Sequence, residues 1–261
     1  MKKKNLWHMV WSLAKNDFVT KYSSNYLGIF WAFVQPIVTV SIYVFIFQVA
    51  FRAGGAMNGY PYTLWLIAGI IPWFFFSEAL LGATNSFIEY SYLVKKVVFQ
   101  IQVLPMVKVI SALFVHVFFI ILALLIYIFN SRIPDWHILQ LPYYTICLIC
   151  LVSVLAYFTA SIVPLFKDFY QIVNILLQIG MWLTPIMWNF DDMAEKLGKW
   201  GFVFKLNPMF YVVRGYRDSF MYGQWFWNHM LSLYFWGFIA VFGIIAYRCY
   251  HRMKPHFADV L

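Results

Sequence analysis

The stretch NSFIEYSYLVKKVVFQIQVLP, residues Asn85–Pro105, interrupts a chain that is apolar over most of its length. It carries the acid Glu89 and the adjacent bases Lys95 and Lys96, interleaved with large apolar side chains such as Tyr92. The flanking segments are apolar for about 20 residues or more, which is the length of helix that crosses a bilayer. We therefore predict that this stretch is an elbow between two transmembrane helices and lies in water at one membrane face.

The composition of the whole chain points to the same environment. Of its 261 residues, 63% are hydrophobic and only 11% are charged, whereas soluble domains carry about 25% charged residues. So few charges do not cover a soluble globule, which indicates an integral membrane protein. The net charge of +9 lies in short segments beside apolar spans, which favours contact with lipid headgroups and not with nucleic acid.

The pattern along the chain predicts an all-α membrane protein with six transmembrane helices. The predicted spans are residues 29–51, 62–83, 106–129, 141–165, 169–188 and 230–247. Residues 1–28 alternate apolar and polar side chains at helical spacing and include Trp7 and Trp11, so they are predicted to form an amphipathic helix on the membrane surface. A solvated helix is the alternative. Residues 251–261 form a short tail, and no cleaved signal peptide is expected.

The segment between the fifth and sixth spans is too polar for a full span and too apolar for a simple loop. Residues 191–204 are a candidate amphipathic helix. Asn207 and Pro208 are typical of an N-cap and the first helical position, and Gly223 is typical of a helix end. Two short helices broken at a proline predict a re-entrant hairpin over residues 191–223. A domain that lies on the membrane surface is the alternative.

The distribution of basic residues orients the chain. With six spans, twelve of the nineteen lysines and arginines share a side with the termini and the elbow. The other seven lie on the opposite side: Arg52, Arg132, Lys196, Lys199, Lys205, Arg214 and Arg217. Five of those seven belong to the long segment before the last span, where the positive-inside rule is weaker. Both termini and the elbow are therefore predicted to be cytoplasmic.

Sequence motifs for catalysis or nucleotide binding are missing. The chain has no G-x-x-x-x-G-K-[ST] phosphate loop, no H-E-x-x-H and no G-x-S-x-G. Cys147 and Cys150 fall in the middle of a span without a second pair or a nearby histidine, so a structural role is favoured over metal binding. Glu78 is the one candidate intramembrane acid, and no internal repeat is evident, which disfavours an ion-coupled carrier. No catalytic or metal-binding residue is predicted.

Aromatic side chains are spread along the spans, and they suggest a path for sugar. The C–H faces of sugar rings stack on aromatic rings, and Tyr and Trp also offer a polar tip. The alternative is that these rings face lipid or form interfacial belts. The candidate channel residues are Tyr43, Phe47, Trp73, Trp182 and Trp188.

Five motifs together give a family resemblance that covers nearly the whole chain. They are NYLGIFWAFVQP at 25–36, GIIPWFFFSEA at 69–79, NSFIEYSYLVKKVVF at 85–99, LNP at 206–208 and GYRD at 215–218. The chain resembles the membrane subunits of type-2 ABC exporters for polysaccharides, which handle O-antigen, teichoic acid and capsule chains. The elbow and the LNP segment are the most specific parts. One departure is Gln100, where proline is expected; it is predicted to change the exit angle of the elbow and not the family assignment.

The resemblance implies how such a subunit works. It would be a homodimer in the bacterial plasma (inner) membrane, bound to two copies of a separate ATPase that carries the ATP and Mg²⁺, with no cofactor on this chain. The substrate would be a lipid-linked glycan made in the cytoplasm. Spans 1 and 5 would line a channel, and the re-entrant hairpin would form its external exit. The candidate exit residues are Asn207, Pro208, Tyr211, Arg214, Tyr216 and Arg217.

The elbow is the predicted contact with the ATPase. Residues 87–97 would couple the two proteins, with Glu89, Tyr92, Lys95 and Lys96 facing the partner. The interfacial helix would add Asp17 and Lys21 beside them. Two alternatives stay open: the same fold exporting a drug, lipid or other small hydrophobic molecule, and a membrane-embedded enzyme acting on a lipid-linked substrate.

Overall fold

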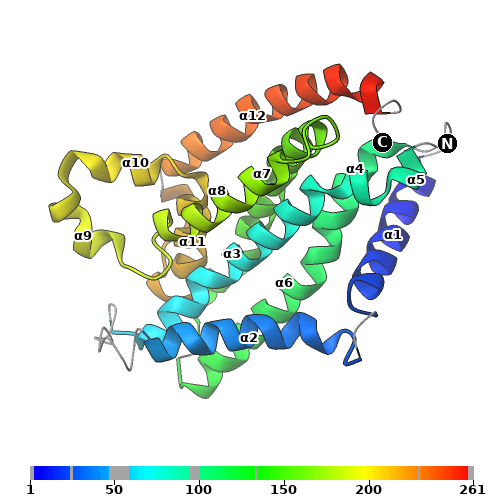
Figure 1. The fold of residues 1–261 in the computed structure, drawn as a ribbon. Helices are drawn as coiled ribbons and strands as arrows, with labels where there is room; N and C mark the ends of the chain where they lie inside the picture. The colour runs from blue at the N-terminus through cyan, green and yellow to red at the C-terminus, as the bar shows by residue number, and fades with distance from the viewer. Residues whose placement is uncertain are drawn as a thin grey trace.

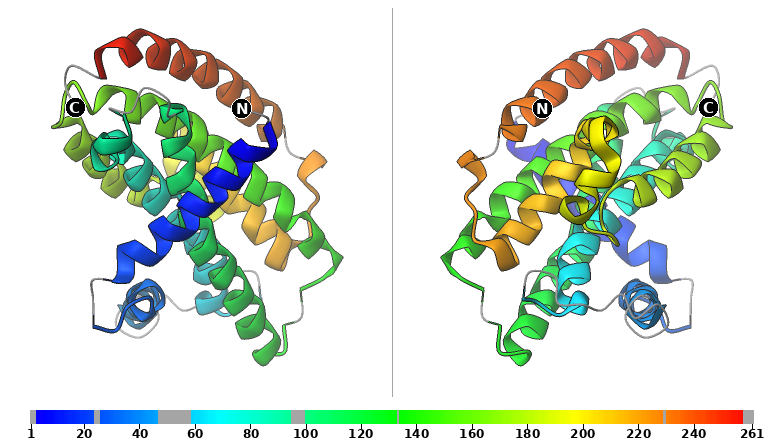
Figure 2. Two further views of the ribbon diagram at one scale, coloured as in Figure 1. Left: turned by 90° about the vertical axis from the view of Figure 1, so that its right-hand side faces the viewer. Right: turned by 90° about the vertical axis from the view of Figure 1, so that its left-hand side faces the viewer.

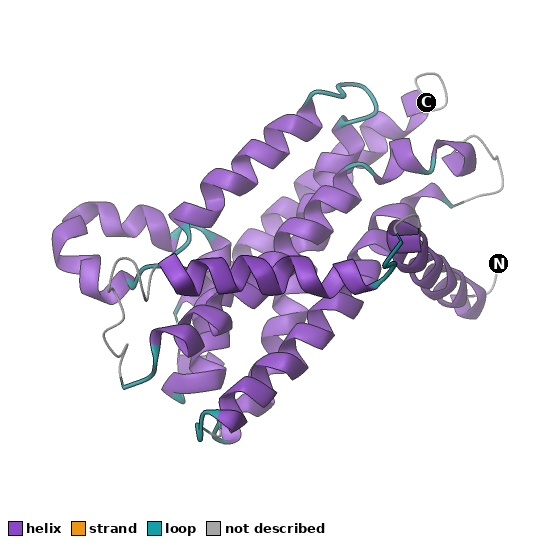
Figure 3. Ribbon diagram, turned by 60° about the horizontal axis from the view of Figure 1, so that its bottom comes forward, coloured by secondary structure: helices purple, strands orange, loops and turns teal. Residues whose placement is uncertain are grey.

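The computed structural model describes residues 3–23, 26–46, 59–94, 100–132, 134–228 and 230–257. Within these ranges the chain is helical, with short connecting loops and no β-strand (Figure 3). The prediction of an all-α protein is therefore confirmed for the described residues. Parts of the elbow and of the first predicted span lie outside them, including Lys95, Lys96 and Phe47.

The body of the protein is a bundle of helices that run lengthwise and reverse direction from one to the next (Figure 1). They are α2 (Phe30–Val44), α3 (Tyr62–Thr84), α6 (Leu104–Phe129), α7 (Leu141–Ile162), α8 (Phe169–Leu183) and α12 (Leu231–Met253). Short 3₁₀ turns connect or extend them: η2 (Ile101–Val103), η3 (Trp136–Gln140), η6 (Phe226–Asn228) and η7 (Lys254–His256). A further turn, η4 (Gly198–Trp200), lies in the segment between α8 and α12.

Four helical segments within the described residues are long and apolar enough to cross a membrane. They are Tyr62–Thr84, Ile101–Phe129, Trp136–Ile162 and Leu231–His256. α2 and α8 are apolar but have only 15 residues each. The predicted first span continues past α2 into residues outside the described ranges, so its full length is not seen.

The end of α8 differs from the prediction for a physical reason. The fifth span was predicted to reach residue 188, but the helix ends at Leu183 and Thr184 is extended, with φ −81° and ψ 130°. A proline disfavours helical backbone in the residue before it, and Pro185 follows Thr184. The chain therefore leaves the helix about one turn earlier than hydrophobicity alone suggests.

The core is organised around α3, which has neighbours on every side. Its fully buried side chains include Trp65, Leu66 and Ile70, and it packs against α6, α7, α8 and α11 (Pro208–Arg217). α12 lies at the periphery and exposes Leu233 and Val241. Because exposed aliphatic side chains are unfavourable in water, this face of α12 is suited to lipid or to a protein partner.

The helix α11 lies inside the bundle. The Asn207 side chain accepts a hydrogen bond from the backbone N–H of Met209 at 3.0 Å, as an N-cap does. A π-helical turn, η5 (Asp218–Tyr222), continues α11 and ends at Gly223, which has a φ of 62°. Both predicted limits of this helix are therefore confirmed. The predicted helix over 191–204 is instead two helices, α9 (Phe190–Leu197) and α10 (Gly201–Lys205), because Gly198 has a φ of 48°.

Gly215 allows α11 to approach α7 closely. A Cβ atom at this position would lie 2.0 Å from the ring of Tyr144, which is itself fully buried. We expect Gly215→Ala to lower the free energy of unfolding by about 3 kcal/mol or more, the upper range for overpacking a core. Thermal unfolding in detergent measures this effect. Gly237→Ala is the control, since its added Cβ meets no atom within 4 Å, and equal melting of the two variants would contradict the expectation.

The elbow and the two ends of the described chain lie at one end of the bundle (Figure 1). The elbow consists of two single-turn helices, α4 (Ser86–Glu89) and α5 (Ser91–Val94), followed by residues outside the described ranges and then η2. α1 (Lys3–Ser23) lies obliquely across this end of the bundle (Figure 2). The α9–α10 segment projects at the opposite end (Figure 1).

Candidate coupling site

The helix α1 is attached to the start of α6 by an apolar contact. Val10 and Ala14 of α1 are buried against Val103, Val107 and Ile110. These contacts use one side of α1 and leave Trp7 and Trp11 exposed. The attachment brings the polar C-terminal half of α1 beside the elbow.

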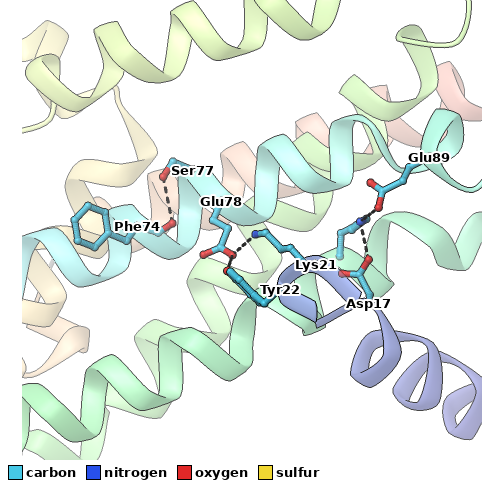
Figure 4. A network of polar contacts seen from close by, with 8 residues as sticks. Asp17, Lys21, Tyr22, Phe74, Ser77, Glu78 and Glu89 are labelled. Atoms are coloured by element: carbon cyan, nitrogen blue, oxygen red, sulfur yellow. Dashed lines mark hydrogen bonds and ion pairs between the residues drawn. The ribbon is translucent and has the colours of Figure 1, made fainter. Parts of the chain in front are cut away.

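A buried lysine joins three segments at this point. The Nζ atom of Lys108, on α6, lies 2.6 Å from Asp17 Oδ1 of α1 and 2.6 Å from Glu89 Oε1 of α4. Figure 4 shows Asp17 and Glu89 converging from their separate elements. The side chains of Lys108 and Asp17 are 9% and 4% exposed, and that of Glu89 is 46% exposed. A lysine this deeply buried is stable only when its charge is paired, so Lys108 ties α1 and the elbow to α6.

Tyr90 strengthens the same junction from the elbow. Its hydroxyl donates a hydrogen bond to Asp17 Oδ1 at 2.5 Å, and its ring lies 5.1 Å from Lys108 Nζ. Burial raises the pKa of Tyr90, and its hydrogen bond to Asp17 raises that pKa further. The hydroxyl therefore remains a donor at neutral pH. We call Asp17, Glu89, Tyr90 and Lys108 the elbow junction.

A second ion pair connects α1 to α3. Lys21 Nζ lies 2.5 Å from Glu78 Oε1, and the Tyr22 hydroxyl lies 3.4 Å from the same oxygen (Figure 4). Burial alone would lower the pKa of Lys21, but its attraction to Glu78 and their hydrogen bond outweigh burial, so this pKa is raised. The two side chains are 46% and 28% exposed. The pair therefore has a weaker effect than the elbow junction, because solvent screens it.

We expect this difference to be measurable. Lys21→Met should lower the free energy of unfolding by at most about 1 kcal/mol, since exposed ion pairs contribute about 0–1 kcal/mol. Chemical denaturation in detergent is the measurement, with increasing salt as a second test, because salt screens exposed pairs. A loss that is larger than this and independent of salt would contradict the assignment of Lys21–Glu78 as a peripheral pair.

A cavity of about 670 Å³ is lined by residues of both ionic groups. Small residues on α3 and α6, including Gly82 and Ser111, leave this space. Its remaining lining residues are Leu13, Asn16, Asp17, Thr20, Lys21, Glu78, Glu89, Tyr90, Tyr92, Lys108 and Ala112. Beside the apolar contact of Val10 and Ala14 with the start of α6, α1 and the elbow therefore also meet α3 and α6 through charged side chains around this cavity.

Three of the predicted coupling residues are brought together here. Asp17 and Glu89 share Lys108, and Lys21 lies on the same helix as Asp17. Tyr92 is 58% exposed beside them. Lys95 and Lys96 lie outside the described residues. Asp17 is buried in its contacts within the chain, whereas Glu89 and Tyr92 are exposed enough to meet another protein. Their role toward an ATPase stays a prediction.

Sequence reasoning missed Lys108 and Tyr90 as members of the site. Lys108 lies within a long apolar helix, where a charged side chain is costly unless it is paired. A charge in so unfavourable a position indicates an acidic partner nearby. The sequence offers no signal for which acid that is, since Asp17 lies 91 residues before it in the chain.

The predicted channel aromatics occupy several environments. Trp73 is buried and meets α8 at Gly180, where a Cβ atom would lie 3.0 Å from the indole. Trp182 is 60% exposed, and its carbonyl accepts a hydrogen bond from Trp188 Nε1 at 3.0 Å. Tyr43 of α2 lies against α8, with its hydroxyl 4.0 Å from Met181 Sδ.

The helices α2 and α8 also present exposed apolar faces. These faces consist of Ile37, Val38 and Ile42 on α2, and Ile172, Ile175, Leu176 and Ile179 on α8. They belong to the two spans that the resemblance assigns to a channel.

The predicted exit residues are placed mainly inside the protein. Tyr211, Tyr216 and Arg217 are buried, and Arg214 is partly exposed. The Tyr216 hydroxyl lies 2.8 Å from His116 Nε2 and 2.9 Å from Thr145 Oγ1.

The segment between α10 and α11 joins this group to the end of α8. Pro208 is the first residue of α11. Asn207 Nδ2 donates a hydrogen bond to Thr184 Oγ1 at 2.8 Å. No group of three or more His, Cys, Asp and Glu side chains suited to a metal occurs among the described residues.

The helical bundle, with four described helices long and apolar enough to cross a bilayer, fits an integral membrane protein. Residues 8–221 match the family described as ABC-2 type transporter, and the chain belongs to that family. Two O-antigen export system permease proteins RfbA from Klebsiella pneumoniae are 26% and 25% identical to it, each across 95% of this chain and 93% of the relative. An RfbA permease of the same description from Myxococcus xanthus is 26% identical over 80% of this chain and 78% of its own length.

Proposed function

We propose that this chain is the channel-forming permease of an ATP-driven exporter that moves a lipid-linked polysaccharide out of the cytoplasm. The substrate would be an O-antigen-like or teichoic-acid-like glycan, and the membrane would be the bacterial inner membrane. The observation that carries this proposal is the similarity to permeases named for O-antigen export, which extends over 95% of the chain in two relatives. The aromatic side chains on α2, α3 and α8 are suited to such a substrate.

The proposed topology has six spans, formed by α2, α3, α6, α7, α8 and α12. The alternating direction of these helices supports it (Figure 1). The termini and the elbow would be cytoplasmic, which the excess of basic residues on their side supports. Residues 191–223 would form a re-entrant hairpin at the external end, where their loops line a cavity or are covered by protein.

The proposed assembly is a homodimer with two copies of a separate ATPase. The absence of a phosphate-binding loop from the sequence supports a separate energy source, and ATP and Mg²⁺ would bind that partner. No cofactor is assigned to this chain. The exposed apolar faces of α2 and α8 are suited to meeting a second copy around the channel. The elbow would receive the movement of the ATPase and pass it through the elbow junction to α1 and α6.

Reconstitution tests the substrate. The chain would be placed in proteoliposomes with the ATPase encoded next to it, and ATP hydrolysis would be measured with lipid-linked glycans, phospholipids or hydrophobic drugs. We expect stimulation by a lipid-linked glycan and not by the lipid carrier alone. Stimulation by drugs or phospholipids without any response to glycan would favour the alternative small hydrophobic substrate. Turnover of a lipid-linked substrate without ATPase would instead indicate an enzyme.

The elbow is tested by reversing its paired charges. Lys95→Glu combined with Lys96→Glu should lower glycan-stimulated ATP hydrolysis and export, because like charges would then face the ATPase surface. Membrane insertion should not change, and it is measured by the pattern of protease cleavage in inverted vesicles. Lys199→Glu is a matched control on α9–α10 at the far end of the bundle. Normal export by the double variant would contradict the proposal that the elbow is the contact with the ATPase.

A further inference from the structure

The broken end of α8 leaves backbone groups that need partners. After Leu183 the chain passes through Thr184, Pro185 and Ile186 without continuing the helix. The Thr184 carbonyl accepts a hydrogen bond from the Ile186 N–H at 2.7 Å, but the carbonyls of Pro185 and Ile186 have lost the helical donors that would normally satisfy them. In a membrane such groups are tolerated only where protein or water supplies the hydrogen bonds.

A single arginine from α11 supplies two of these bonds. Nη1 of Arg217 donates to the Pro185 carbonyl at 2.7 Å, and Nη2 donates to the Ile186 carbonyl at 2.7 Å. The residue is 6% exposed. Hydrogen bonds from a charged donor are stronger than neutral ones. The next carbonyl, of Met187, accepts from the Tyr62 hydroxyl at 2.9 Å, so three successive carbonyls are held from α11 and α3.

The same guanidinium also contacts α3. Its central carbon lies 3.5 Å from the centre of the Trp65 ring, which is a cation–π contact. One turn further along α3, Gly69 leaves the space that the guanidinium fills, since a Cβ there would lie 2.6 Å from Nη2. One buried charge thus joins the broken end of α8 and the helices α3 and α11.

We infer that Arg217 is a positioning residue that holds the broken end of α8 against α3 and keeps the external end of the permease closed between export events. We call its contacts with the Pro185 and Ile186 carbonyls and with Trp65 the latch. The inference rests on the proposed export function, which makes this the exit side. A buried charge in a membrane protein is costly and is usually functional. When the latch releases, the carbonyls of residues 185 and 186 exchange the guanidinium for water or sugar hydroxyls, which only an open exit provides.

The test uses the complex with its ATPase in liposomes loaded with a small anionic dye, without ATP. We expect Arg217→Met to raise the rate of dye leak roughly tenfold or more, because the variant loses both hydrogen bonds to the Pro185 and Ile186 carbonyls and the loss of even one charge-assisted bond corresponds to about a tenfold change. Arg217→Lys should restore closure only partly, because an ammonium lacks the planar fork that reaches two carbonyls and stacks on Trp65. Glycan-stimulated ATP hydrolysis is measured on the unmodified complex, as a separate test of the proposed function.

A second variant removes the latch without removing the charge. Gly69→Ala places a methyl group where Nη2 lies, and alanine favours helix more than glycine does, so α3 should remain folded. We expect it to leak as Arg217→Met does. Gly237→Ala, with open space around its added Cβ, is the control and should stay tight.

The outcomes separate the latch from the proposed function. If Gly69→Ala and the Arg217 variants insert normally and remain as tight as the control, the latch is refuted. If Arg217→Met does not fold, Gly69→Ala alone decides the result. Variants that leak while no lipid-linked glycan stimulates even the unmodified complex would support the latch and contradict polysaccharide export. If a lipid-linked glycan stimulates the unmodified complex but the variants do not leak, the result would support polysaccharide export and contradict the latch.

Discussion

Replacing Lys108 by methionine is expected to lower the free energy of unfolding by about 3–5 kcal/mol, the cost of breaking a buried ion pair by removing one partner. The substitution leaves Asp17 buried and brings it next to Glu89 with no cation between them. Methionine keeps most of the length and apolar volume of the lysine stem, so lost packing contributes little. Thermal and chemical unfolding in detergent measure the change.

The loss should also reach function, because Lys108 connects α1 and α4 to α6. We expect glycan-stimulated ATP hydrolysis to fall further than the basal rate of the ATPase. The double variant Asp17→Leu with Lys108→Met should be more stable than Lys108→Met alone, since no buried charge is left unpaired. Glu89→Gln is the matched control. Because the Glu89 carboxylate is half-exposed, loss of its charge should lower the free energy of unfolding by about 1 kcal/mol or less. If Lys108→Met unfolded at the same temperature and denaturant concentration as the wild type, the stabilising role of the elbow junction would be contradicted.

The second large effect is expected at Phe87, the apolar anchor of the elbow. Its side chain is fully buried, and its ring centre lies 5.0 Å from that of Phe257 and 6.2 Å from that of Tyr250. Phe87→Ala should lower the free energy of unfolding by about 3–5 kcal/mol, as for other buried aromatic residues. The contact joins α4 to the C-terminal helix, so both should loosen.

Hydrogen exchange locates this effect. In Phe87→Ala we expect faster amide exchange over residues 86–94 and at the end of α12, with little change at the α9–α10 end. Tyr92→Ala is the control for stability, because an exposed ring in the same elbow should change it by about 0.5 kcal/mol or less. Uniformly faster exchange along the whole chain would show that Phe87 stabilises the bundle as a unit and does not anchor the elbow in particular.

The features predicted well from the sequence are those with a local physical cause. Long apolar segments form helices because a membrane leaves the backbone no other partner, and α3 and α6 begin and end within two residues of their predicted limits. Asn207, Pro208 and Gly223 mark the ends of one helix, since capping depends only on neighbouring residues. The early end of α8 also has a local cause, in Pro185, which hydrophobicity did not reveal.

The partners of the charged residues were decided by the tertiary structure alone. Sequence shows that a charge within an apolar span, as at Lys108, is costly and needs a partner. Arg217 carries no such signal, because it lies in the more polar segment before the last span. The sequence does not show that Lys108 meets Asp17, or that Arg217 meets two backbone carbonyls 31 and 32 residues away. Hydropathy records whether a side chain prefers water, which is a property of one residue. Which groups pair depends on how the helices pack, and that determines both the elbow junction and the Arg217 contacts.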